Sequence, residues 1–128
     1  MLYYFQSASC ANNIERIITM TSNFKGVMPA LVTPLTKDEK INVPELEKLI
    51  SYLIKQDAGG FYIGGATGEG LLLDVEQRKI LCEKSIEFIG KDKTKIVHIT
   101  DMNFRNTIEL AKHAEACGAD AISSIAPT

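Results

Sequence analysis

A glycine-rich turn holds the residues of this chain that are best suited to chemistry. Six of the nine glycines lie between residues 59 and 70, and residues 64–70 read Gly-Gly-Ala-Thr-Gly-Glu-Gly directly after a short apolar run. Glycine lets a backbone approach a ligand closely, and consecutive N–H groups in such a turn form a concavity for an anion. Thr67 adds a hydroxyl and Glu69 a carboxylate. The turn therefore predicts a site that grips a small carboxylate or phosphate.

Two nucleotide-binding motifs do not fit this turn. No Gly-Lys-Ser/Thr follows it, as a Walker A loop requires in order to reach the β/γ-phosphates. The dinucleotide pattern G-x-G-x-x-G fails as well, because the residue three positions after Gly70 is Leu73. On composition alone, a tight turn that binds no ligand is the alternative interpretation.

Strands and helices alternate along the rest of the chain. Asn42 and Asp74 are expected helix N-caps, the second as part of a capping box with Gln77, and glycines stop each helix. Apolar runs predict strands at 26–33, 61–63, 95–99 and 121–125, and apolar periodicity predicts helices from 42 to 59, from 74 to about 89 and from about 106 to 117. This alternation predicts parallel strands in an α/β sheet or a (β/α) barrel. In either fold ligands bind at the carboxyl ends of the strands, where the glycine turn lies.

The chain is too short for a complete barrel. Its 128 residues supply about half of what a (β/α)8 barrel needs. We expect residues 1–23 to be a disordered leader or a mis-called gene start, with Met20 as the alternative start. Residues 24–128 then form the N-terminal half of the barrel. Since a half barrel leaves apolar edge strands, the chain alone is expected to be marginally stable or oligomeric. A sharp two-state melt of a monomer would count against that.

Composition excludes several classes of partner. With a net charge of −2 the chain lacks the excess of basic residues that nucleic-acid-binding proteins carry. No apolar run approaches the length of a membrane-spanning helix. Three widely spaced cysteines, Cys10, Cys82 and Cys117, indicate buried thiols in a reducing compartment rather than disulfides, and no spacing is typical of a metal site. A cytoplasmic protein is therefore expected.

Several stretches resemble one enzyme superfamily. Residues 26–34 (GVMPALVTP), 62–70 (YIGGATGEG) and 108–121 (IELAKHAEACGADA) are similar, in order and spacing, to the N-acetylneuraminate lyase and dihydrodipicolinate synthase superfamily. The resemblance runs from about residue 24 to residue 128. It implies a TIM barrel and a class I aldolase, in which a lysine forms a Schiff base with pyruvate and no metal or other cofactor is needed. It also implies a homo-oligomer, commonly a tetramer.

The resemblance assigns roles to residues of the glycine turn. Binding of the pyruvate carboxylate falls on Ala66 and Thr67, and Tyr62 is a possible contributor. The residues that support the loop are Gly64, Gly65, Gly68 and Glu69. The family usually has a hydroxyl residue where this chain has Ala66, which puts a proton relay in doubt but leaves the backbone N–H available.

The Schiff-base lysine and the proton-shuttling tyrosine of the family would lie beyond Thr128. Lys95 stands at the wrong end of its strand to replace that lysine, so the 128-residue chain is predicted to be inactive alone. Tyr62 and the Gly64-Gly65 pair favour the sialic acid lyase branch, which splits N-acetylneuraminate into N-acetylmannosamine and pyruvate.

Three other functions stay open. One is a dihydrodipicolinate synthase-type or other 2-keto acid aldolase, acting on pyruvate and an aldehyde. Another is a non-catalytic half barrel that pairs with a second chain. The last is a phosphate-binding regulatory module, which would need only the glycine turn.

Four further side chains and Glu69 have simpler expected roles. His98, in an apolar strand, is expected to be a core histidine with satisfied hydrogen bonds, and His113 to be solvated on its helix. Glu69 is expected to anchor the turn by hydrogen bonds to backbone amides. Asp101 and Asn103 are expected to cap the helix that follows them.

Overall fold

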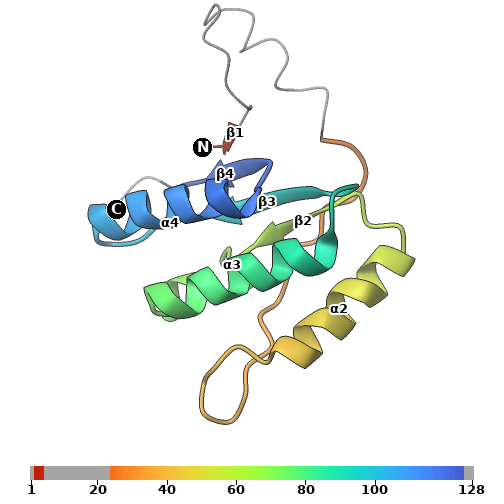
Figure 1. Cartoon of the computed structure of the whole chain (residues 1–128), viewed down its shortest axis with the longest axis horizontal. Helices are drawn as coiled ribbons and strands as arrows, with labels where there is room; N and C mark the ends of the chain where they lie inside the picture. The colour runs from red at the N-terminus through yellow and green to blue at the C-terminus, as the bar shows by residue number, and fades with distance from the viewer. Residues whose placement is uncertain (1, 5–23, 126–128) are drawn as a thin grey trace, which may run out of the picture.

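The computed structural model describes residues 2–4 and 24–125. Its elements in chain order are β1 (Leu2–Tyr4), α2 (Val43–Lys55), β2 (Gly60–Ile63), the 3-10 helix η2 (Gly70–Leu72), α3 (Val75–Ile89), β3 (Thr94–His98), α4 (Phe104–Cys117) and β4 (Ala121–Ser123). The strands form one sheet in the order β1-β4-β3-β2 (Figure 1). Strands β2, β3 and β4 are parallel, whereas β1 is antiparallel to β4.

All three helices cover the same face of the sheet. They lie next to one another in chain order, α2 against α3 and α3 against α4 (Figure 1). Apolar strand side chains such as Phe61, Val97 and Ile122 share one core with helix residues such as Leu81 and Leu110. Parallel strands in sequential order with helices on one face only form the wall of a (β/α) barrel, because a doubly wound sheet carries helices on both faces.

Alternate strand residues point to the opposite face, which is the interior side of that wall. Tyr62 pairs with Ile96 across β2 and β3, and Ile96 pairs with Ala121 across β3 and β4. Since side chains alternate along a strand, His98 and Ser123 share this face. The inner face therefore carries Tyr62, His98 and Ser123 near the carboxyl ends of the strands.

The predicted strand at 26–33 lies in the expected place but is not a regular strand. Its Leu31 N–H donates to the carbonyl of Tyr62 over 2.9 Å, and the Tyr62 N–H donates to the carbonyl of Pro29 over 3.1 Å. Only Ala30 forms a bridge with β2. Proline has no N–H to donate, so Pro29 interrupts the ladder.

The helix boundaries follow from their caps. Asn42 and Asp74 accept hydrogen bonds from the N–H groups of Glu45 and Gln77, as expected. The capping box is only half formed, because the Gln77 side chain instead accepts from the N–H of Ile41 over 2.9 Å. Helix α4 begins two residues before the predicted start, directly after its N-cap Asn103.

The predicted leader contains a strand that sequence patterns did not suggest. Residues 2–4 form β1 and pair with β4 in the register Leu2↔Ser123 to Tyr4↔Ala121. They therefore cover one edge that a half barrel would leave open. The rest of the leader, with Cys10 and Met20, lies outside the described residues. Within the described part of the chain, no helix has the length and apolar character needed to cross a membrane.

Candidate functional site: the glycine turn after β2

The glycine turn is held by its own backbone at the carboxyl end of β2. Gly64 turns the chain out of the strand at a φ of 68°, a conformation that glycine adopts without strain. The N–H of Gly70 donates to the carbonyl of Gly65 over 3.1 Å, and that of Glu69 to the carbonyl of Ala66 over 3.0 Å. These bonds close the loop around Ala66 and Thr67 and fix its shape before any ligand arrives.

Ala66 and Thr67 present unused hydrogen-bond donors. Both residues are exposed, although their glycine neighbours Gly65 and Gly68 are buried. Among the residues that the structure describes, no acceptor takes the backbone N–H of Ala66 or Thr67, and the Thr67 hydroxyl has no partner. Two adjacent N–H donors and one hydroxyl are thus free to hold an anion, which is the chemistry predicted from the glycine pattern.

The ring of Tyr62 packs against the glycine turn at Gly65. A Cβ at Gly65 would collide with that ring, so glycine is required there. The Tyr62 hydroxyl makes a short hydrogen bond with Ser123 on β4. The structure therefore places Tyr62 on the inner face of the wall, beside the turn, rather than among the helix-facing core. Its participation in ligand binding stays a prediction.

His98 lies near Tyr62 on the same face. The two ring centroids are 6.3 Å apart. The expectation of a fully satisfied histidine is wrong, because Nδ1 is buried and has no hydrogen-bond partner among the described residues. Burial, reinforced by the nearby Arg78 cation, lowers the pKa of His98 below its usual value. The imidazole is therefore neutral at neutral pH.

Glu69 supports the turn through its backbone, not its side chain. Its φ of 54° places it in the left-handed region, and its side chain is exposed and makes no capping hydrogen bond. The expected anchoring by the carboxylate is therefore wrong. The side chain instead lines a hollow of about 400 Å³ next to residues 35–40, separate from Ala66 and Thr67.

Thr33 and Arg78 also shape this rim, and sequence analysis missed both. The Thr33 hydroxyl donates to the carbonyl of Gly68 over 2.6 Å. Arg78 on α3 is only 4% exposed, and its guanidinium donates to the carbonyls of His98 at 2.8 Å and Thr100 at 2.7 Å. Arg78 lies on the buried face of α3 with Leu81, Cys82 and Ser85. A charged residue on an otherwise buried helix face is the sequence feature that could have identified it.

The capping role is confirmed for Asn103, which is the N-cap of α4, whereas Asp101 supports the cap from the preceding loop. The Asn103 side chain accepts from the N–H of Arg105 over 3.0 Å. Asp101 accepts from the N–H of Asn103 over 2.8 Å and from the Asn106 side chain over 3.2 Å. These residues organise the loop after β3 rather than a second ligand site.

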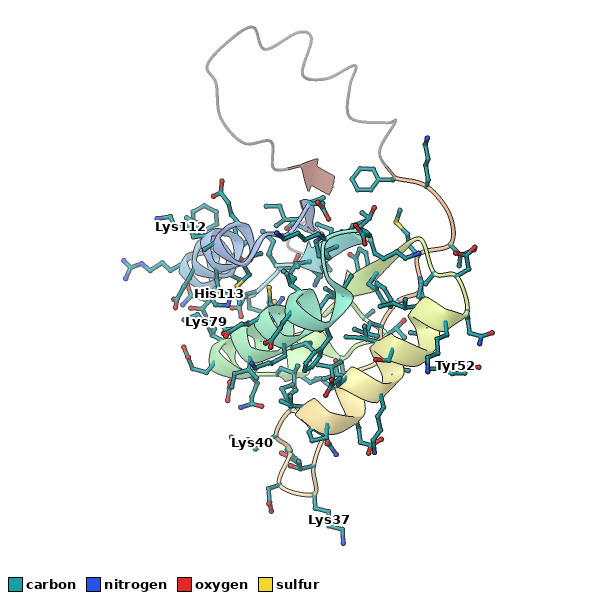
Figure 2. The ribbon with its side chains drawn as sticks, turned by 45° about the vertical axis from the view of Figure 1, so that its right-hand side comes forward. Lys37, Lys40, Tyr52, Lys79, Lys112 and His113 are labelled. Carbon is teal, nitrogen blue, oxygen red and sulfur yellow. The ribbon has the colours of Figure 1, made fainter. Side chains whose placement is uncertain are left out.

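His113 is not solvated as predicted. It is half-buried between α4 and α3, with Nε2 3.3 Å from the Lys79 carbonyl and 3.4 Å from the Cys117 sulfur (Figure 2). Cys82 joins this group, so that the possible ligand atoms of the three residues all lie within 4.8 Å of one another. The sequence spacing of these residues gave no metal-site signal, and it is the packing of α4 on α3 that brings them together.

Lys95, the one lysine that β2, β3 and β4 carry, is committed elsewhere. Its ammonium lies 3.1 Å from the Asp120 carboxylate and donates to the carbonyls of Gly90 and Lys93. It is buried near the amino end of its strand, on the helix side of the sheet. Its geometry agrees with the prediction that it cannot serve the glycine turn.

Comparisons with known proteins agree on one family. Residues 23–128 match the Dihydrodipicolinate synthetase family. N-acetylneuraminate lyase of Xenopus tropicalis is 38% identical over 106 residues, covering 81% of this chain and 35% of the relative. A sialic acid aldolase catalytic lysine mutant from Ruminococcus gnavus has a TM-score of 0.80 at 34% identity, over 84% of this chain and 35% of that one. A prophage protein of the dihydrodipicolinic acid synthase family from E. coli K12, in complex with pyruvate, has a TM-score of 0.78 at 34% identity, over 81% and 35%. The chain spans about a third of the length of these relatives.

Proposed function

The chain belongs to the dihydrodipicolinate synthetase family, and from that premise we propose that its glycine turn holds the carboxylate of pyruvate in a Schiff-base aldolase. The observation that carries the proposal is that the N–H groups of Ala66 and Thr67 and the Thr67 hydroxyl have no hydrogen-bond partner in the described part of the chain. A carboxylate has two oxygens and several lone pairs, so it can accept all three donors at once. Charge-assisted bonds of this kind are about twice as strong as neutral ones.

The surroundings of the turn favour a small, singly charged ligand. Neither Lys nor Arg occurs between residues 56 and 77, and the Arg78 guanidinium is engaged by the carbonyls of His98 and Thr100. We therefore expect the anion to be held by dipoles rather than by an opposite charge. Phosphate, with its higher charge, normally recruits such cations. This argues for a carboxylate over the phosphate-binding module considered as an alternative.

The sialic acid lyase reaction is the function we favour within the family. The Xenopus tropicalis relative is named N-acetylneuraminate lyase, and Tyr62 with Gly64-Gly65 fits that branch. The products would be pyruvate and N-acetylmannosamine. Another 2-keto acid aldolase activity stays the alternative, supported by the family member solved in complex with pyruvate.

Ala66 leaves backbone binding intact while it removes a side-chain relay. Its N–H is available beside that of Thr67, but its methyl group neither donates nor accepts a proton. We expect Thr67 and Tyr62 to supply the remaining hydroxyl groups on this rim. Tyr62 already bonds Ser123, so its hydroxyl is oriented in advance.

Pyruvate is expected to shift the amide protons of Ala66 and Thr67 downfield in the NMR spectrum of the ¹⁵N-labelled chain, and the shifts should saturate. Replacing Thr67 by valine removes one donor at constant shape and should weaken pyruvate binding about 10-fold. Thr94→Val is the matched control, since Thr94 begins β3 at the opposite end of the strands, and it should leave affinity unchanged.

Two further ligands sharpen this test. Pyruvamide keeps the ketone but lacks the charge, and it should give no saturating shift. Inorganic phosphate should compete poorly, and efficient competition by phosphate would support the regulatory module instead. Equal effects of Thr67→Val and Thr94→Val, or unmoved Ala66 and Thr67 amides, would contradict the proposed site.

Borohydride treatment with pyruvate is expected to leave the 128-residue chain without a covalent adduct. A Schiff base needs a lysine amine within reach of the ketone, and the Lys95 side chain pairs with Asp120 on the other side of the sheet. Intact mass spectrometry provides the measurement. A pyruvylated lysine in this chain alone would overturn the predicted inactivity.

A further inference from the structure

We propose that Cys82, His113 and Cys117 form a binding site for a thiophilic divalent cation, such as Zn²⁺, between α3 and α4. The site is independent of the glycine turn and of the aldolase proposal. Its three side chains come from two helices, Cys82 from α3 and the other two from α4. Thiolate sulfur and imidazole nitrogen are the ligands that zinc prefers, and two cysteines with one histidine occur in known zinc sites.

The spacing of the side chains suits one shared cation. His113 and Cys117 are four residues apart on α4 and therefore lie on one helix face. The Nε2 atom of His113 is 3.4 Å from the Cys117 sulfur. Zn–N and Zn–S bonds of normal length at a tetrahedral angle separate such atoms by about 3.6 Å. All three ligand atoms lie within 4.8 Å of one another, so small side-chain rotations bring them around one ion.

Existing contacts of these side chains do not compete strongly with a cation. Both cysteines are free thiols in the structure. His113 Nε2 approaches the Lys79 carbonyl, but that carbonyl lies inside α3, where the helix ladder supplies its own N–H donor. Turning the imidazole toward a cation therefore leaves no buried group unsatisfied. Figure 2 shows His113 and Lys79 close together where α4 packs on α3.

A cation at this site has to displace the protons of the two thiols. Burial, the neighbouring Cys117 thiol and Glu83 all raise the pKa of the Cys82 thiol, and burial and Glu83 raise that of Cys117. Both thiols are thus protonated when the site is empty. A divalent cation would displace two protons to solvent and bind two thiolates and a neutral imidazole, giving a site of zero net charge. Glu83 adds a negative potential that attracts the ion.

A bound cation would connect α3 to α4 at a point where an ion pair already links them. Lys79 on α3 contacts Glu109 on α4, one turn before His113. With three protein ligands among the described residues, the fourth tetrahedral position stays open to water or to an external ligand. We therefore expect an exchangeable site rather than a closed structural one.

Titration of the reduced full chain with Co²⁺ tests the site directly. One equivalent should bind, with the visible bands of tetrahedral cobalt and a thiolate charge-transfer band in the near ultraviolet, and Zn²⁺ should displace it. His113→Gln and Cys117→Ser should each weaken Co²⁺ binding by more than about 100-fold, since even the loss of an outer-shell partner costs 10–100-fold. The matched control is Cys10→Ser, the third cysteine, which should bind Co²⁺ like the parent chain.

A second measurement guards against unfolded variants. Zn²⁺ should raise the thermal unfolding midpoint of the parent chain and of Cys10→Ser, but not that of His113→Gln. Binding by Cys82→Ala is interpreted only if its circular dichroism spectrum matches that of the parent chain, because loss of the buried Cys82 side chain can unfold the protein. The site would be refuted by absent tetrahedral bands in the reduced parent chain, by unchanged binding in His113→Gln, or by loss of binding in Cys10→Ser. A Cys82–Cys117 disulfide whose reduction restores no metal binding would refute it as well.

Discussion

Replacing Gly70 by alanine is expected to lower the free energy of unfolding by about 3 kcal/mol or more. A Cβ at this position would collide with the carbonyl oxygen and carbon of Gly64, which are backbone atoms that the turn holds in place. The N–H of Gly70 also donates to the Gly65 carbonyl. The turn therefore has to open before an alanine fits. Urea unfolding followed by circular dichroism measures the loss.

Gly118→Ala is the matched control for this prediction. Gly118 has a φ of 90° at the end of α4, and nothing lies within 4 Å of a Cβ placed there. Its replacement adds left-handed strain alone, which costs about 1–2 kcal/mol. Gly70→Ala should in addition abolish the pyruvate-induced amide shifts of Ala66 and Thr67, whereas Gly118→Ala should keep them. If both variants lost equal stability, close packing of the turn would not be the cause.

The helices and the order of the sheet were predictable because their signals are local. Asn42 and Asp74 cap α2 and α3 within three residues, and Gly90 and Gly118 end α3 and α4. Apolar runs separated by such helices leave little choice but parallel strands. The glycine turn was predictable for the same reason, since its shape depends on its own backbone. Three local features departed from prediction: α2 ends at Lys55 rather than at Gly59, α4 begins two residues early, and the capping box at Gln77 is half formed because that side chain accepts from the N–H of Ile41.

Contacts between distant segments were not predictable in this way. The pairing of β1 with β4 joins residues 2–4 to residues 121–123, and nothing in three residues specifies such a partner. His113 and Cys82 are more than one helix apart in sequence, and their meeting depends on how α3 and α4 are rotated about their axes. The sequence predicted an ordinary core histidine at position 98. Whether Nδ1 finds a hydrogen-bond partner depends on the neighbours on the inner face, and among the described residues it has none.

Arg78→Met is expected to lower the free energy of unfolding by about 3–4 kcal/mol. The substitution keeps most of the buried volume but removes the donors to the carbonyls of His98 and Thr100. Both acceptors then stay buried without a charged partner at the carboxyl end of β3. Asp101, 3.8 Å from the guanidinium, also loses its cation. Burial lowers the pKa of Arg78 and Asp101 opposes that shift, so the side chain stays a cation in the native protein.

Two variants distinguish the stability contributed by the two Arg78 hydrogen bonds from the stability contributed by its positive charge. Arg78→Lys keeps the charge, but an ammonium cannot match the planar fork that reaches both carbonyls, so it should recover only part of the lost stability. Arg105→Met removes an exposed arginine from α4 and should change stability by less than about 0.5 kcal/mol. Urea unfolding of the three variants gives the ranking. Full recovery in Arg78→Lys would mean that charge alone matters. An effect of Arg78→Met no larger than that of Arg105→Met would show that Arg78 does not hold the rim in place.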